Sequence, residues 1–292
     1  MRATSLVLIA ANVVYATSPV ATRVVLDDVP PALLALFRLV IGAVVLLPTA
    51  WALERPAPFT SSDHWRVAWM GILGFAAAFA LSHWGIERST ATNAALLIIV
   101  EPVSIMLLGP AVLGERLSRR EQAGAALALL GALLVVLNGI PGITHGLAPH
   151  WRGDLLLVLS GVAYGAYTLI GRTVLQRHGP VGITARSIVW GAVTLAPLVV
   201  GEWLGGRRPV LTASAVLGAL YLGGVITALG YLLWNWALAR AEAARVAAFV
   251  AIQPVAGALL GVMLLREPLT PFTVVGGVLV AAGLWLTAGG RG

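Results

Sequence analysis

One segment of this chain occurs in two related copies, as EPVSIMLLGPAVLGERLSRREQAG at 101–124 and as QPVAGALLGVMLLREPLTPFTVVG at 253–276. Each copy has a proline near its start, a long apolar run and a glutamate just before a polar break. The shared residues keep a constant separation of 152 positions: Pro102 and Pro254, Gly109 and Gly261, Glu115 and Glu267, Leu117 and Leu269, Gly124 and Gly276. A fixed separation that pairs proline and glutamate in order indicates an internal repeat.

The repeat covers most of the chain. The same separation joins Gly71, Trp84 and Gly131 to Gly223, Trp236 and Gly283, and nearer the start a separation of 149 joins Tyr15, Arg23, Gly42 and Pro48 to Tyr164, Arg172, Gly191 and Pro197. We expect two units, 1–140 and 153–288. If each unit has five membrane spans, the second is inserted in the opposite direction. Such inverted repeats are typical of alternating-access transporters, whose substrate site lies near the middle of the membrane.

Composition supports membrane insertion. The 292 residues are 59% hydrophobic and 11% charged, with a mean hydropathy of +0.92 and no cysteine. Soluble domains carry about 25% charged residues, so the main solvent of this chain is lipid. The apolar runs predict ten spans, at about 3–25, 32–52, 65–84, 92–114, 121–139, 153–174, 182–203, 212–237, 245–265 and 271–288. The predicted fold class is an all-α integral membrane protein with ten transmembrane helices in two inverted five-helix repeats.

Cap residues lie at several of the breaks. A proline pair at 30–31 starts the second helix, because proline suits a first helical turn. Ser118 and Glu121 have the spacing of a capping box for the fifth helix. Thr270 and Pro271 give the tenth helix a cap followed by proline. Paired backbone groups matter especially in lipid, where water cannot satisfy them.

The net charge of +7 comes from 19 basic residues, all arginine, against 12 acids. These arginines are scattered between apolar runs, which indicates loops at an anionic membrane surface rather than nucleic-acid binding. With the N-terminus inside, the cytoplasmic segments hold eleven arginines and the opposite side holds six, leaving out Arg38 and Arg186, which lie in spans. This bias predicts that both termini are cytoplasmic.

The repeated segments also resemble the EamA domain of the drug/metabolite transporter superfamily. The resemblance lies in Glu101-Pro102-Val103 through Leu117-Ser118 to Gly124, in Gln253-Pro254-Val255 through Leu269-Thr270 to Gly276, in the eighth span from Tyr221 to Leu238, and in Arg38 after Phe37. It implies a ten-helix carrier of small metabolites in the bacterial inner membrane, commonly an exporter of amino acids or related compounds. Arg266 departs from the family pattern, which usually has glycine at this position.

Glu101 is the main candidate for chemistry within a span. A charge in hydrocarbon costs about 2.5–3.5 kcal/mol on insertion scales, so a residue of this kind is a functional candidate. Pro102 removes a helix hydrogen bond beside it. The functional interpretation is a site for proton coupling or for a substrate amine; the alternative is a neutral acid that bonds to a neighbouring helix. Its repeat equivalent, Gln253, cannot ionise, so any coupling differs between the halves.

Other polar side chains are expected to line a substrate cavity. Asn12, Tyr15 and Ser18 share a face of the first helix, and Tyr164 and Tyr167 share a face of the sixth. Trp234 and Asn235 lie in the eighth span. The alternative for tryptophans near span ends is the aromatic belt of the membrane interface. Arg38 either extends to the interface, which the sequence favours, or pairs with an acid or a substrate carboxylate.

We expect no cofactor, because the sequence holds no nucleotide-binding loop or metal-ligand cluster. The expected partners are a small-molecule substrate and membrane lipids, with no nucleic acid. Glycines in the fifth and tenth helices indicate close helix packing, with a homodimer seam as the alternative. A polytopic membrane enzyme and a non-transporting membrane scaffold are the competing functions. Glu115 and Glu267, which end the fourth and ninth helices, are interpreted as structural turn residues.

Overall fold

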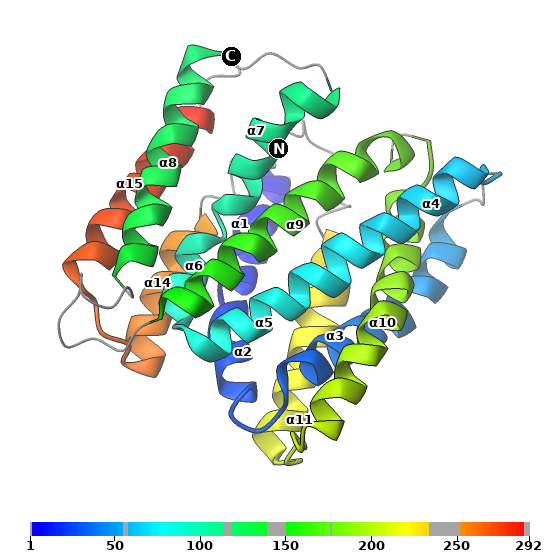
Figure 1. Cartoon of the computed structure of the whole chain (residues 1–292). Helices are drawn as coiled ribbons and strands as arrows, with labels where there is room; N and C mark the ends of the chain where they lie inside the picture. The colour runs from blue at the N-terminus through cyan, green and yellow to red at the C-terminus, as the bar shows by residue number, and fades with distance from the viewer. Residues whose placement is uncertain are drawn as a thin grey trace.

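The computed structural model describes residues 2–54, 58–113, 118–138, 150–175, 177–233 and 252–288. Within these ranges the chain forms helices joined by short connections (Figure 1). Eight helical spans are long and apolar enough to cross a membrane, and two shorter apolar helices follow them. The all-α membrane fold is therefore confirmed. Where both ends of a span are described, the expected bounds agree with the observed ones to within about one helical turn.

Some spans are single helices and others are joined segments. In chain order the elements are α1 (Arg2–Ala16), α2 (Ser18–Val25), α3 (Pro31–Leu53), α4 (Ser61–Trp69), η1 (Met70–Ala77), α5 (Ala78–Arg88), α6 (Ala91–Leu97), α7 (Val100–Leu113), α8 (Arg119–Leu137), α9 (Trp151–Leu175), α10 (Pro180–Leu204), α11 (Ala213–Leu220), η2 (Tyr221–Leu229), α14 (Ile252–Leu265) and α15 (Pro271–Ala288). The pairs α1–α2, α6–α7 and α11–η2 each form one span, as do α4, η1 and α5 together.

The helix starts use the caps that the sequence predicts. Helix α3 begins at Pro31. Before α8, the backbone N–H of Ser118 donates to Glu121 Oε2 at 2.9 Å, and that of Glu121 donates to Ser118 Oγ at 3.2 Å. Thr270 Oγ1 accepts a backbone N–H three residues on, at 3.2 Å, and α15 begins at Pro271. These three predicted helix starts are confirmed.

The first and fourth spans are interrupted within the membrane. Helices α1 and α2 meet at Thr17, whose hydroxyl lies 2.6 Å from the hydroxyl of Tyr221. Helices α6 and α7 are separated by a turn at Ile98 and Ile99. Pro102 follows this turn and has no N–H to continue the helical ladder. Broken spans of this kind expose polar backbone groups near the middle of a membrane carrier.

The third and eighth spans each contain a π-helical stretch, η1 and η2, at repeat-equivalent positions. Gly71 lies in η1, and a Cβ there would lie 2.9 Å from the backbone nitrogen of Gly191. Gly223 lies in η2, and a Cβ there would lie 2.7 Å from Cβ of Ile41. The wide turns therefore occur where a glycine lets a helix of the other half approach closely. Short π-helical stretches are frequent at functional sites.

Equivalent helices of the two halves pack against each other in opposite directions. Figure 1 shows α8 beside α15, and the glycines between them explain the close approach. Gly124, early in α8, faces Gly283, late in α15, while Gly131, late in α8, faces Gly276, early in α15. In each pair, a Cβ on one glycine would lie 2.6–2.8 Å from the carbonyl oxygen of the other. The two helices are therefore antiparallel, as an inverted repeat requires.

Two glutamates link α3 and α10 at their opposite ends. Glu54, just after α3, accepts backbone N–H groups from Val181 and Gly182 at 2.8 and 2.7 Å, at the start of α10. Glu202, near the end of α10, accepts the backbone N–H of Ala32 at 3.0 Å, at the start of α3. A carboxylate at a helix N-terminus satisfies unpaired amides and opposes the helix dipole. Each half thus caps a helix of the other half.

The exterior of the bundle is apolar. Trp51, Leu204 and Met263 are 81%, 80% and 74% exposed, and many other large apolar side chains also face outward. Such a surface fits a lipid environment. The glycine faces of α8 and α15 pack against each other within the chain, as the expected close helix packing requires.

Buried apolar residues form two clusters. The first includes Leu34, Leu97, Val135, Leu222 and Val280, and Tyr15 packs against it. The second includes Leu39, Phe75, Tyr167, Ile188 and Leu195, and Phe79, Tyr164 and Tyr231 pack against it. The aromatic residues predicted for the site therefore border both clusters.

Candidate functional site

Glu101 lies in the first turn of α7, directly after the break in the fourth span. Its backbone faces two glycines of α9: a Cβ on Gly161 would lie 3.1 Å from the nitrogen of Glu101, and one on Gly165 would lie 3.3 Å from its carbonyl oxygen. Tyr164 directly precedes Gly165 in α9, so it lies next to this contact. A carboxylate is also favoured in the first turn of a helix by the helix dipole.

A cluster of aromatic side chains includes the two tyrosines of α9. The hydroxyl groups of Tyr164 and Tyr231 are hydrogen-bonded to each other. The rings of Tyr164 and Tyr167 lie 5.4 Å apart, and Phe75 packs 5.3 Å from Tyr167 and 5.8 Å from Tyr231. Such rings combine a broad apolar surface with hydroxyl groups that bind polar parts of a solute. The two tyrosines predicted on α9 therefore lie together beside Glu101.

Tyr15 reaches the same group from the first span. Its ring fills the space beside Gly230, where a Cβ would lie 2.5 Å from the Tyr15 hydroxyl oxygen. It interacts electrostatically with Arg38 and Tyr231. The structure therefore brings together Tyr15, Arg38, Glu101, Tyr164 and Tyr167 of the predicted site, and we call these five residues with Tyr231, His83, Phe75 and Phe79 the central group.

Arg38 points into the bundle rather than to the membrane interface, so the favoured expectation for this residue is wrong. It is 8% exposed, and its Nη1 lies 3.1 Å from Nε2 of His83. Nδ1 of His83 lies 3.1 Å from the carbonyl oxygen of Pro31. The guanidinium also stacks on Phe79, 4.7 Å from the ring centre. The third span holds the arginine in place because it supplies both the histidine and the ring.

Asn12 and Gln253 form a separate pair. Gln253 Nε2 donates to Asn12 Oδ1 at 2.8 Å, and Asn12 Nδ2 donates to the carbonyl oxygen of Leu8 at 2.8 Å. These contacts join the first span to α14. Within the described residues, the hydrogen bonds of this pair do not extend to the central group. Trp234 and Asn235 lie outside the described residues.

Sequence reasoning did not identify Phe75, Phe79 and His83 as site residues. The signal was present, because these three residues recur at every fourth position and so share one helix face. The predicted span at 65–84 placed His83 at a membrane end. The helix instead runs on to Arg88, which places His83 more than one turn inside.

Glu267 fits the predicted role of a structural turn residue. Its carboxylate accepts the backbone N–H groups of Ala91 and Thr92, each at 2.7 Å, and the hydroxyl of Thr92 at 2.6 Å. It therefore caps α6 from the end of α14. Its repeat equivalent, Glu115, lies outside the described residues.

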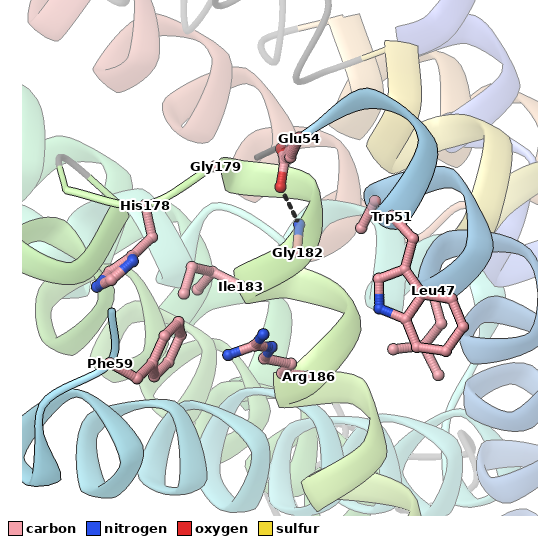
Figure 2. A pocket seen from close by; sticks show the side chains of 10 residues that line it. Leu47, Trp51, Glu54, Phe59, His178, Gly179, Gly182, Ile183 and Arg186 are labelled. Atoms are coloured by element: carbon pink, nitrogen blue, oxygen red, sulfur yellow. Dashed lines mark hydrogen bonds between the residues drawn. The ribbon is translucent and has the colours of Figure 1, made fainter. Parts of the chain in front are cut away.

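A pocket lies away from the central group, at the end of α3 and the start of α10 (Figure 2). It has a volume of about 320 Å³ and is lined by Leu47, Ala50, Trp51, Glu54, Phe59, His178, Gly179, Gly182, Ile183 and Arg186. Phe59 packs against His178 at 4.3 Å and beneath the Arg186 guanidinium at 4.2 Å. None of the predicted site residues lines it. No group of side chains suited to a metal ion occurs among the described residues.

The antiparallel repeats, the broken spans and the central group define a membrane carrier of the inverted-repeat class. The chain belongs to the EamA-like transporter family, whose model matches residues 2–137 and 151–289. This membership identifies it as a transporter rather than an enzyme or a scaffold.

Named relatives are similar over nearly the whole chain. A "Probable terminal-alkyne amino-acid exporter" of Streptantibioticus cattleyicolor is 30% identical, over 96% of this chain and 91% of its own length. A "Probable amino-acid metabolite efflux pump" of Salmonella typhimurium is 29% identical, over 95% of this chain and 92% of its own. One solved structure, described only as a crystal structure of protein, has a TM-score of 0.65 at 21% identity and covers 98% of this chain and 96% of that chain. It shows the same fold.

Proposed function

We propose that this transporter exports small metabolites, namely amino acids or related compounds, across the bacterial inner membrane by alternating access. The observation that carries the proposal is the central group, in which polar and aromatic side chains from both halves meet inside the bundle. The names of the relatives from Streptantibioticus and Salmonella support an amino-acid-like substrate and the export direction.

The division into units 1–140 and 153–288 is part of the proposal. Antiparallel packing of equivalent helices means that the two halves can exchange roles, so that one opens to each side in turn. The interruptions at Thr17 and at Ile98 and the π-helical stretches η1 and η2 give the moving spans defined bending points. The central group lies beside these points.

Glu101 is proposed to couple transport to protons. It lies in the first turn of α7 beside two glycines and makes no ion pair with a basic side chain among the described residues, which allows it to bind either a proton or a substrate amine. Exchange of one for the other would drive export against a gradient. The repeat-equivalent Gln253 is bonded to Asn12, so this role falls to one half only.

The proposed orientation has both termini in the cytoplasm. It rests on the excess of arginine on that side. In this orientation the pocket of Figure 2 lies at the cytoplasmic ends of α3 and α10.

The test is transport by the purified chain in proteoliposomes, with a panel of labelled amino acids and the matching amines, with and without an imposed pH gradient. We expect exchange of at least one amino acid and stimulation by the gradient. Empty liposomes and liposomes that hold Glu101→Gln are the controls. Absence of exchange for every compound would contradict the proposed substrate class.

A further inference from the structure

We infer that Arg38 binds a substrate carboxylate, and that this transporter therefore takes molecules that carry a free carboxylate group. The inference rests on the proposed function and specifies it. It is carried by the surroundings of the Arg38 guanidinium, described below one contact at a time.

The charge of Arg38 has no counter-ion among the described residues. The side chain is 8% exposed inside a membrane bundle, and it makes no ion pair with any of the described residues. The side chains that contact it, the His83 ring and the Phe79 ring, carry no negative charge. A buried cation costs free energy unless an anion pairs with it. A bound anion would supply the missing charge.

Part of the hydrogen-bonding capacity of the guanidinium is also unused. Nε of Arg38 is buried and has no hydrogen-bond partner among the described residues. Nη1 is bonded to His83. A guanidinium presents parallel N–H groups that match the two oxygens of a carboxylate. The unpartnered Nε is therefore the donor of the fork that a ligand carboxylate would satisfy.

His83 is a positioning residue for Arg38. Its Nδ1 faces the carbonyl oxygen of Pro31, which can only accept, so Nδ1 carries the ring proton. Nε2 is then a lone-pair acceptor for the N–H of Arg38 Nη1. This tautomer holds the guanidinium at Nη1, while Nε has no partner among the described residues. Phe79 supports its face at 4.7 Å.

The rest of the central group indicates what else the ligand contains. Arg38 stacks on Phe79, which packs 5.7 Å from Phe75, and Phe75 packs 5.8 Å from Tyr231. Phe75, Tyr164 and Tyr167 supply apolar ring surface next to Phe79, and α9, which carries both tyrosines, packs against the backbone of Glu101. This combination suits a small zwitterion with an apolar side chain: carboxylate at Arg38, ammonium at Glu101.

The experiment compares compounds that differ only in the carboxylate. Purified chain in detergent is titrated with phenylalanine, phenylalaninamide and phenethylamine, and with leucine, leucinamide and isopentylamine, while thermal unfolding is followed. We expect the two carboxylates to bind at least tenfold more tightly than the amides or amines. Exchange of the same six compounds is measured in proteoliposomes.

The variants assign this preference to Arg38. In Arg38→Gln and Arg38→Lys, the preference for carboxylates over amides and amines is expected to fall at least tenfold. Glutamine removes the charge, and lysine keeps the charge but lacks the two parallel N–H groups of the guanidinium. His83→Leu should weaken it, and His83→Gln should restore much of it, because an amide can both donate to Pro31 and accept from Arg38. Arg186→Gln is the matched control, since Arg186 also stacks on a phenylalanine but is exposed. Each variant is checked for a folded, monodisperse state.

The outcomes separate the two proposals. Exchange without a preference for carboxylates, or a preference that persists in folded Arg38→Gln, would overturn the inference and leave the proposed function standing. Neither binding nor exchange of any of the six compounds would overturn both.

Discussion

Gln253 donates a hydrogen bond to Asn12 at 2.8 Å, whereas its repeat equivalent, Glu101, faces Gly161, the repeat equivalent of Asn12. The same two positions therefore have opposite properties in the two halves. In one half an amide pair links the first span to α14. In the other half a glycine packs closely against the backbone beside an acid, since a Cβ on Gly161 would lie 2.8 Å from Cβ of Val100. The asymmetry lies in the side chains, not in the helix arrangement.

The first prediction concerns coupling. Glu101→Gln should retain exchange of substrate. Its accumulation of substrate under a pH gradient should fall at least tenfold, because the amide cannot bind a proton. Gln253→Glu should not replace it, since Asn12 already occupies the neighbouring position. Proteoliposome uptake at several external pH values measures both. An unchanged pH dependence in Glu101→Gln would exclude this acid as the coupling group.

The second prediction concerns the amide pair. Asn12 is fully buried and makes two hydrogen bonds, so Asn12→Ala should destabilise the protein by about 1–3 kcal/mol, much of it from leaving Gln253 unsatisfied. Adding Gln253→Leu should recover part of this loss. The free energy of unfolding in detergent is measured for the unchanged protein, for each single variant and for the double variant. Strictly additive effects would show that the pair contributes no coupling energy.

The third prediction concerns the glycines between α8 and α15. A Cβ on Gly131 would lie 2.6 Å from the carbonyl oxygen of Gly276, so Gly131→Ala should push the helices apart and destabilise them by about 1–3 kcal/mol. Gly276→Ala should do the same, and the double variant should cost less than the sum because both changes open one gap.

The matched control for the glycine variants is Gly201→Ala in α10. A Cβ there meets nothing within 4 Å. Alanine should therefore stabilise the helix by up to about 1 kcal/mol. Equal effects at Gly131 and Gly201 would show that the close approach of α8 and α15 is unimportant.

The fourth prediction concerns Arg266, which stands where the family usually has glycine. Its φ is 55°, and it directly follows α14. In this left-handed region, the backbone conformation of a residue with a Cβ costs about 1 kcal/mol more than that of glycine. Arg266→Gly should raise the free energy of unfolding by about that amount, whereas Arg266→Ala should not. A destabilised glycine variant would show that the arginine side chain outweighs the strain.

The fifth prediction concerns topology and uses the absence of native cysteine. Both Ser62 and Arg208 are exposed and lie near opposite ends of the bundle in the proposed orientation. In intact cells, Arg208→Cys should react with a membrane-impermeant thiol reagent from outside, and Ser62→Cys should react only after permeabilisation. The reverse pattern would invert the assigned orientation.

The spans, the caps and the repeat were predictable because they depend on local features: apolar length, a serine–glutamate spacing, prolines at helix starts. The site was only partly predictable. Glu101 and the tyrosines stand out as polar residues within apolar runs. The direction of Arg38 depends on His83, whose depth depends in turn on where a helix ends, and apolar runs fix helix ends poorly. The left-handed backbone at Arg266 was visible only as a departure from the family pattern.

The exchange of caps between Glu54 and Glu202 bears on the origin of the fold. Each carboxylate satisfies amides that belong to the opposite half. Two separate copies of one five-helix chain, inserted in opposite directions, would make the same pair of contacts across a subunit boundary. A dimeric ancestor would therefore have had this interlock already, and gene fusion would have turned an association between two molecules into a property of one.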